Sequence, residues 1–174
     1  MLSKRNVFLI GPMGSGKTAV GRHLARALSF GFHDSDAEIE KRTGVDIPFI
    51  FEKEGEEGFR AREREALEQL TQLEPIVLAT GGGAVLHPDN RRALAERGRV
   101  VYLLASINQQ MERTRHGRHR PLLLTADPRA RLDELMRERE PLYAEIADFT
   151  VTTDGRRVQV VAEDILRLLR EGER

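Results

Sequence analysis

The chain of 174 residues contains no cysteine, which excludes disulfides, Cys-ligated zinc, iron–sulfur clusters and thiol catalysis. Neither charge is in excess, because 28 Lys and Arg residues balance 28 Asp and Glu residues. General binding to nucleic acid or to a membrane surface is therefore not expected. No apolar run approaches the roughly 18 residues of a membrane-spanning helix, and Met1 to Asn6 show no signal-peptide core. We predict a cytoplasmic protein with no nucleic-acid or membrane partner.

The composition is typical of one folded domain. Hydrophobic residues make up 40% of the chain and charged residues 32%, which excludes a disordered protein. A globular chain of this length buries roughly 70% of its unfolded surface, enough for a core. No internal repeat or low-complexity linker divides the sequence. We expect a single domain over residues 1–174, acting as a monomer.

Apolar runs alternate with helical patterns along the chain. The runs are continuous, as expected for strands that are buried on both faces of a parallel sheet. The alternation of strand and helix predicts a three-layer α/β domain with right-handed crossovers. The predicted strands are Val7–Ile10, Phe30–His33, Ile76–Ala79, Val100–Leu104 and Phe149–Thr152.

The sequence GPMGSGKT, from Gly11 to Thr18, matches the phosphate-loop pattern G-x-x-x-x-G-K-[ST] at each fixed position. It lies between the first predicted strand and an amphipathic helical pattern, which is the context that the motif requires. Backbone N–H groups of such a loop point at phosphate oxygens, and the helix dipole adds positive potential. We expect Lys17 to reach the β- and γ-phosphates and Thr18 to ligate Mg²⁺. The predicted nucleotide-binding residues here are Gly11, Gly14, Ser15, Gly16, Lys17, Thr18 and Ala19.

Two acidic residues follow the second predicted strand, in the sequence Asp34-Ser35-Asp36. Motor and switch proteins with a phosphate loop carry a Mg²⁺-holding Asp after another strand, whereas here the third and fourth strands run into Thr80 and Ala105. The Asn-Lys-x-Asp motif of GTPases is also absent from the sequence. Acids after the second strand are typical of small-metabolite and nucleotide kinases. The alternative is that one of the two acids only caps the next helix.

A candidate acceptor site begins with Arg60. If a helix starts near Gly58, Arg60 and Glu63 share one face, so Glu63 can orient the guanidinium toward a carboxylate. The alternative is an exposed ion pair of little energy. Arg139 lies in a later helical pattern, and from the residues alone a surface arginine is favoured there.

Three consecutive glycines, Gly81, Gly82 and Gly83, follow the third predicted strand. Ligands of open α/β sheets bind beyond the carboxyl ends of the strands. Three glycines in a row destabilise a folded chain entropically, so close approach of the backbone to a ligand is a reasonable explanation for them. The competing explanation is a plain flexible loop.

The segment from Arg115 to Arg131 has no periodic apolar face and contains Gly117, Pro121 and Pro128. Long irregular segments in compact domains are usually functional. Because the segment lacks aromatic residues for base stacking, its arginines favour a lid over ATP phosphates rather than a nucleic-acid site. A solvated charged loop is the alternative. The basic cluster in and beside the segment comprises Arg113, Arg115, His116, Arg118, His119 and Arg120.

Together these motifs resemble the shikimate kinase family, over nearly the whole chain from Asn6 to about Leu169. They occur in family order as GPMGSGKT, HDSD, IFEKEGEEGFRARE, TGGG, RPLL from Arg120 and RERxPLY from Arg137. Apart from the phosphate loop each motif is weak alone, but the ordered set is highly specific. Among the departures, Lys17-Thr18-Ala19 replaces the more usual Lys-Ser-Thr, and Thr18 keeps the hydroxyl group that Mg²⁺ needs.

The resemblance implies a five-stranded parallel sheet with a substrate-binding helical region at about 34–63 and a lid at about 115–131. It implies Mg²⁺-dependent transfer of the ATP γ-phosphoryl group to the 3-hydroxyl of shikimate, in aromatic amino acid biosynthesis. ATP and shikimate are then the expected small-molecule partners, with Mg²⁺ as the cofactor. The rival enzyme is gluconate kinase or another small-metabolite kinase, and the rival class is a nucleotide-dependent regulatory protein.

The resemblance also implies roles for individual residues. Asp36 matches the acid that contacts the reacting hydroxyl, and Asp34 matches the acid linked to Mg²⁺ beside Thr18. Arg60 and Arg139 match the pair that binds the shikimate carboxylate. Further matches are Gly81, Gly82 and Gly83 at the ring, Phe51 and Phe59 in the apolar wall, Lys17 and Arg120 at the transferring phosphoryl group, and Arg113 and Arg156 at the nucleotide.

Overall fold

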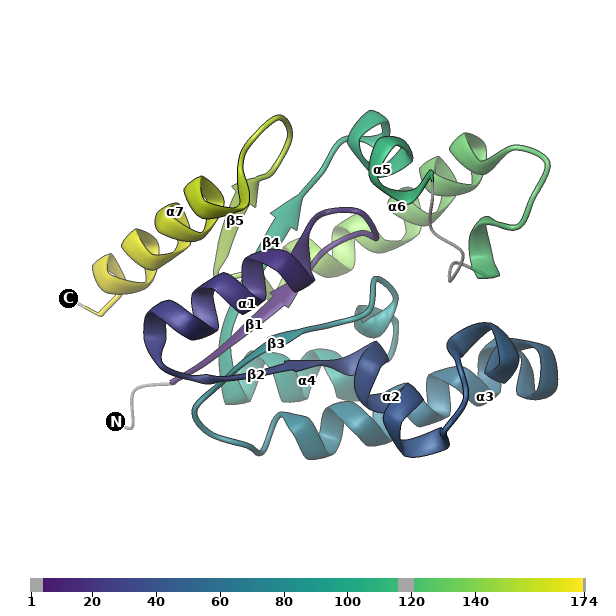
Figure 1. Cartoon of the computed structure of the whole chain (residues 1–174), viewed down its shortest axis with the longest axis horizontal. Helices are drawn as coiled ribbons and strands as arrows, with labels where there is room; N and C mark the ends of the chain where they lie inside the picture. The colour runs from purple at the N-terminus through teal and green to yellow at the C-terminus, as the bar shows by residue number, and fades with distance from the viewer. Residues whose placement is uncertain (1–4, 116–120, 174) are drawn as a thin grey trace.

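A sheet of five parallel strands runs through the centre of the computed structural model, which describes residues 5–115 and 121–173. The strand order is β2–β3–β1–β4–β5 (Figure 1). The five predicted strands are confirmed, with boundaries that differ by at most two residues. The strands are β1 (Asn6–Ile10), β2 (Gly31–Asp34), β3 (Ile76–Ala79), β4 (Gly98–Leu104) and β5 (Phe149–Thr152).

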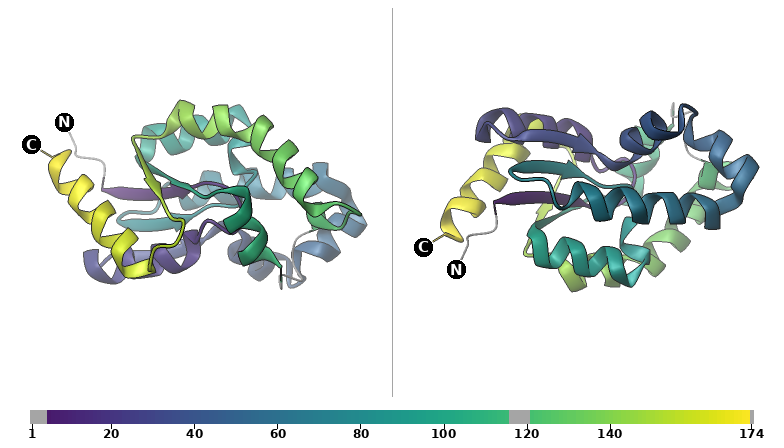
Figure 2. Two further views of the ribbon diagram at one scale, coloured as in Figure 1. Left: turned by 90° about the horizontal axis from the view of Figure 1, so that it is seen from above. Right: turned by 90° about the horizontal axis from the view of Figure 1, so that it is seen from below.

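Helices cover both faces of the sheet, and the three layers are visible in Figure 2. Core contacts place α1 and α7 on one face and the end of α3, α4 and α6 on the other. The predicted three-layer α/β/α fold is therefore confirmed. The described helices are α1 (Lys17–Leu28), α2 (Ser35–Thr43), α3 (Ile47–Leu70), α4 (Pro88–Arg97), α5 (Ile107–Thr114), α6 (Pro128–Ile146) and α7 (Val158–Glu171), with short 3-10 helices η1 (Ala84–Leu86) and η2 (Pro121–Leu123).

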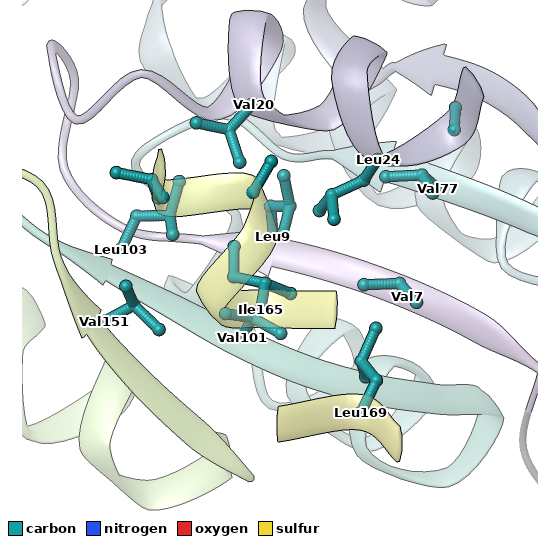
Figure 3. Close-up of a cluster of buried hydrophobic side chains, with 13 residues drawn as sticks. Val7, Leu9, Val20, Leu24, Val77, Val101, Leu103, Val151, Ile165 and Leu169 are labelled. Carbon is teal, nitrogen blue, oxygen red and sulfur yellow. The ribbon is translucent and has the colours of Figure 1, made fainter. Parts of the chain in front are cut away.

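Strand β1 explains why the apolar runs are continuous. Val7 and Leu9 belong to the core beneath α1 and α7, which Figure 3 shows, whereas Phe8 and Ile10 belong to the core on the other face. Successive side chains of a strand point to opposite faces, so a strand with helices on both sides must be apolar at every position. This central strand leads directly into the predicted phosphate loop.

The helical region after β2 differs from the prediction in one respect. A helix was expected to begin near Gly58, but α3 already begins at Ile47, because the Asp46 side chain accepts a hydrogen bond from Phe49 N at 2.9 Å and caps it. The helix is interrupted at Gly55, whose φ of 73° and ψ of −178° are not helical. Only the part after Gly55 matches the expected helix.

The C-terminal part of the predicted lid segment, 115–131, is helical. Helix α6 begins at Pro128, so residues 128–131 belong to its first turn, where Asp127 accepts a hydrogen bond from Ala130 N at 3.1 Å. Residues 121–123 form η2. The part of the segment at 116–120, including Arg118 and Arg120, lies outside the described residues. Among the helices that are described, none is both long and apolar enough to cross a membrane.

Candidate active site

The loop between β1 and α1 has the backbone of a phosphate-binding loop. Gly11, Gly14 and Gly16 adopt φ angles of 143°, 77° and 91°, which side-chain-bearing residues rarely adopt. The buried Lys17 begins α1 and bends back over the loop, where its Nζ donates to the carbonyl oxygens of Gly11 at 2.7 Å and Pro12 at 2.8 Å. The loop therefore carries a positive charge at the N-terminus of a helix, where anions bind.

Thr18 and Asp34 meet at the edge of this loop. Thr18 Oγ1 donates to Asp34 Oδ2 at 2.7 Å. The other oxygen of Asp34 accepts from the backbone N–H groups of Asp36 at 3.0 Å and Ala37 at 3.1 Å, so Asp34 caps α2. The capping alternative is thus correct for Asp34, but it occupies only one of the two carboxylate oxygens.

This pair of residues fits a magnesium ion. Magnesium prefers hard oxygen ligands and usually takes only one or two from the protein, the others coming from water and phosphates. Within the described part of the chain, no group of three or more His, Cys, Asp or Glu residues is arranged to hold a metal. A hydroxyl and a carboxylate oxygen beside the phosphate loop therefore agree with a metal that binds together with a nucleotide.

A pocket lies against the phosphate loop, and it brings together the predicted acceptor residues from four parts of the chain. They come from the start of α2, from α3, from the loop after β3 and from α6. Met13 of the phosphate loop forms part of its wall, so the two sites adjoin. The lining residues are Met13, Asp36, Ile47, Phe51, Phe59, Arg60, Glu63, Gly81, Gly82, Gly83, Pro121 and Arg139.

The sequence reasoning missed three of these lining residues. Met13 occupies a variable position of the phosphate-loop pattern, and Ile47 and Pro121 carry no chemical signal. Phe51 and Phe59, which were predicted, pack against one another with ring centroids 4.9 Å apart and supply an apolar wall.

Half-buried Arg60 and buried Glu63 form an ion pair in this pocket. Arg60 Nη1 donates to Glu63 Oε1 at 2.9 Å, and Glu63 is only 1% exposed, so the alternative of an exposed surface pair is wrong. Burial raises the pKa of the Glu63 carboxyl group, against the opposing effect of Arg60 and Arg139. Burial also disfavours the charged form of Arg60, but Glu63 and Glu56 together outweigh it and the pKa of the guanidinium rises.

Arg139 is also buried, which contradicts the surface position favoured from the residues alone. It is 3% exposed, and burial lowers the pKa of its guanidinium. Among the described residues, three buried polar atoms of this cluster have no hydrogen-bond partner: Nε of Arg60, Nε of Arg139 and Oε2 of Glu63. Such atoms cost about 1–3 kcal/mol each, so they indicate a site built for a polar ligand.

The three glycines after β3 together make room for four charged side chains. A Cβ atom on Gly81 would lie 2.8 Å from Asp36 Oδ1 and 2.9 Å from Glu63 Oε2, and one on Gly83 would lie 2.4 Å from Arg60 Nη2. On Gly82 it would lie 3.3 Å from Arg139 Nη1. Gly83 has an ordinary φ of −96°. The run of glycines is therefore needed for space around the charged cluster.

Of two further predicted nucleotide residues, Arg113 lies against the phosphate loop and Arg156 lies after the end of β5. Arg113 Nη1 donates to the carbonyl oxygen of Gly14 at 3.1 Å, which places this guanidinium against the loop. Arg156 donates to the carbonyl oxygen of Thr152 at 2.9 Å and makes a short ion pair with Asp164.

The combination of a phosphate loop at the carboxyl edge of a parallel sheet and an adjoining cationic pocket defines a P-loop kinase of a small molecule. A family model described as "Shikimate kinase" matches residues 13–170. The shikimate kinase of Thioalkalivibrio sulfidiphilus is 58% identical over 170 residues, which are 98% of this chain and 90% of that protein.

Solved structures agree with this match. The structure titled shikimate kinase from Acinetobacter baumannii in complex with shikimate superposes with a TM-score of 0.95 and 48% identity, covering 97% of this chain and 94% of that chain. The chain belongs to the shikimate kinase family. It is an ATP-dependent phosphotransferase that acts on an alcohol group of shikimate.

The gluconate kinase alternative has weaker support. A gluconokinase from Sinorhizobium meliloti shares the fold with a TM-score of 0.63 at 19% identity, covering 98% of this chain and 94% of that chain. At that identity the likeness concerns the fold alone. The family resemblance drawn from the ordered motifs is thus confirmed, and the comparisons favour shikimate over gluconate as the acceptor.

Proposed function

We propose that the chain transfers the γ-phosphoryl group of ATP to the 3-hydroxyl of shikimate, with Mg²⁺, and gives shikimate 3-phosphate. One observation carries the proposal: the pocket that holds Arg60 and Arg139 shares a wall with the phosphate loop, since a Cβ on Gly82 would lie 3.3 Å from both Arg139 Nη1 and Met13 N. An acceptor bound by the arginines would be held beside the phosphates, which is the arrangement that in-line transfer needs.

Arg60 and Arg139 would bind the shikimate carboxylate. Two guanidiniums can receive one carboxylate with several charge-assisted hydrogen bonds. Glu63 Oε1 lies 2.9 Å from Arg60 Nη1 and so helps to fix the direction of the Arg60 guanidinium. Phe51 and Phe59 would contact the apolar part of the ring, and Gly81, Gly82 and Gly83 would border it.

Asp36 would bind the reacting hydroxyl. It lines the acceptor pocket at the first turn of α2, two residues after the predicted metal residue Asp34. The loose transition state of phosphoryl transfer needs little early removal of the proton, so orientation of the hydroxyl is the larger part of this role. Asp36 then accepts the proton as the new O–P bond forms.

Lys17 would stabilise the charge that develops on the transferring phosphoryl group, because it lies at the phosphate loop on the N-terminal turn of α1. Thr18 and Asp34 would hold Mg²⁺, which when bound neutralises phosphate charge. Arg113 and Arg156 would border the nucleotide together with the loop residues Gly11, Gly14, Ser15, Gly16 and Ala19. Arg120 stays a prediction for the phosphoryl group, since it lies outside the described residues.

We further propose that residues 1–174 act as one kinase domain, with a substrate-binding region at about 34–63 and a lid at about 115–131. The chain would work as a monomer in the cytoplasm, with ATP and shikimate as its partners. Size-exclusion chromatography with light scattering tests whether the chain is monomeric in solution.

A calorimetric titration tests the acceptor site. Shikimate and gluconate are titrated separately into the ligand-free protein and into an Arg139→Lys variant. We expect the wild-type protein to bind shikimate but not gluconate. The Arg139→Lys variant should bind shikimate at least about tenfold more weakly, because a lysine cannot reproduce the bidentate fork of arginine. Equal affinity of wild type and variant would contradict the assignment of Arg139.

A further inference from the structure

A buried tyrosine touches the acceptor site from the helix that carries Arg139. Tyr143 lies one turn after Arg139 on α6, and its side chain is fully buried. Its hydroxyl donates to the carbonyl oxygen of Gly82 at 2.5 Å. Arg139 lies close to the same hydroxyl: burial raises the pKa of Tyr143, and the neighbouring Arg139 guanidinium opposes this effect. Tyr143 therefore joins the helix that carries Arg139 to the glycine loop by a hydrogen bond.

The Tyr143 hydrogen bond holds the glycine loop to a different element from its other hydrogen bonds. Gly81 N donates to Ser35 Oγ at 3.0 Å, which ties the loop to α2, and Ala84 N donates to the carbonyl oxygen of Gly81 at 3.0 Å within the turn. The Tyr143 hydroxyl ties the loop to α6. It thus links the two elements that carry Gly82 and Arg139.

The position of the loop matters because it packs against both guanidiniums. A Cβ on Gly83 would overlap Arg60, and the point where a Cβ of Gly82 would lie is 3.3 Å from Arg139 Nη1. Movement of the loop toward the guanidiniums would therefore displace one or both arginines. Their spacing decides whether a single carboxylate can contact both of them.

A second tyrosine, Tyr102, packs against the first. The Tyr102 ring, from β4, stacks on the Tyr143 ring with centroids 5.0 Å apart, and its hydroxyl makes a short hydrogen bond to Glu140 Oε2. Burial raises the pKa of the Tyr143 hydroxyl, so this group stays protonated and keeps its donor. The sequence contains only these two tyrosines, so each serves as a control for the other.

We propose that Tyr143 is a positioning residue for acceptor binding. Its hydroxyl holds the Gly82 carbonyl group in a fixed position relative to Arg139. It thereby sets the distance between the glycine loop and the two arginines that would bind the acceptor carboxylate. This inference rests on the acceptor site proposed above. It predicts that loss of the hydroxyl weakens binding of shikimate and leaves binding of ATP unchanged.

The first test compares Tyr143→Phe with the matched variant Tyr102→Phe. Each removes one buried hydroxyl from the same stacked pair, so a purely structural role would affect both alike. For Tyr143→Phe we expect the KM for shikimate to rise about tenfold, with kcat and the KM for ATP within about twofold of wild type. For Tyr102→Phe we expect no change in either KM. Equal effects of the two variants, or an equal rise in both KM values of Tyr143→Phe, would overturn the proposal.

A spectroscopic test reports on the hydrogen bond itself and does not depend on activity. Glycine labelled with ¹³C at the carbonyl and with ¹⁵N gives a carbonyl–amide correlation only at Gly-Gly pairs, and the sequence has two, Gly81-Gly82 and Gly82-Gly83. The Gly82 carbonyl signal should shift in Tyr143→Phe and stay in place in Tyr102→Phe. A Gly82 signal that does not respond to Tyr143→Phe would overturn the hydrogen bond, whether or not the chain phosphorylates shikimate.

If Tyr143→Phe fails to fold, incorporation of 3-fluorotyrosine tests the role of the Tyr143 hydroxyl in a protein that keeps both tyrosine hydroxyls. The fluorine makes each hydroxyl a stronger donor. The Gly82 carbonyl signal should shift, and the Kd for shikimate should change at least about twofold while the Kd for a non-hydrolysable ATP analogue does not. No change in either quantity would overturn the proposal.

Discussion

Replacement of Gly83 by alanine should separate acceptor binding from nucleotide binding. The new Cβ atom would lie 2.4, 2.5 and 2.6 Å from Nη2, Nη1 and Cζ of Arg60, distances that non-bonded atoms do not adopt. Because the end of an arginine side chain is flexible, we expect Arg60 to move away while the fold stays intact. That movement breaks the 2.9 Å hydrogen bond between Arg60 and Glu63.

The size of the effect follows from the contact that is lost. A hydrogen bond between charged groups contributes about 1.5–3 kcal/mol. Displacement of Arg60 should remove such a contact to the shikimate carboxylate, so the KM for shikimate should rise about 10- to 150-fold. It also leaves Glu63 buried beside a displaced partner, so the free energy of unfolding should fall by about 1–3 kcal/mol.

Steady-state kinetics with each substrate varied in turn measures both effects, and a thermal melt checks the fold. Gly31→Ala is the matched control, since its Cβ would meet Ile76 Cγ2 at an ordinary 3.6 Å, away from the pocket. We expect the KM for ATP to stay within about twofold of wild type in both variants. A wild-type KM for shikimate in a folded Gly83→Ala protein would refute the explanation of the glycine run.

Four further substitutions test individual assignments. Lys17→Ala should lower kcat by about 10²-fold or more with the fold intact, because it removes a charge that acts on the transition state; near-normal turnover of the folded variant would remove Lys17 from the mechanism. Arg60→Lys should weaken shikimate binding by about 1.5–3 kcal/mol at unchanged affinity for ATP, and calorimetry with both ligands decides this. Asp36→Asn should lower kcat by about 10²–10⁴-fold at any Mg²⁺ concentration, whereas added Mg²⁺ should partly restore Asp34→Asn. The same Mg²⁺ response in both variants would contradict the division of roles between Asp34 and Asp36.

The sheet and the phosphate loop were predictable from the sequence, because their signals are local. Continuous apolar runs such as Val7–Ile10 indicate strands buried on both faces, and the glycines at 11, 14 and 16 report backbone angles that other residues rarely adopt. Asp34 shows the limit of such signals. Capping was posed as the alternative to a role in the kinase site, and the structure shows that one carboxylate oxygen caps α2 while the other accepts a hydrogen bond from Thr18.

The buried charges were not predictable, because burial depends on tertiary packing. Glu63 and Arg139 stand in charged helical patterns that resemble solvent-exposed faces, yet they are 1% and 3% exposed where α3 and α6 pack around the glycine loop. The sequence indicated the partnership of Arg60 and Glu63 by spacing alone. The start of α3 at Ile47 was missed, although Asp46 followed by Pro48 is a helix-start signal.

The most direct test of the proposed function is a coupled assay of ADP release with purified protein, ATP and Mg²⁺. Shikimate and gluconate are supplied in parallel, and the phosphorylated product is identified by mass spectrometry and NMR. We predict ADP release that depends on shikimate, with one phosphate on its 3-hydroxyl, and only background release with gluconate. ADP release with gluconate that equals or exceeds that with shikimate, or a phosphate on another hydroxyl, would contradict the assignment of the acceptor pocket.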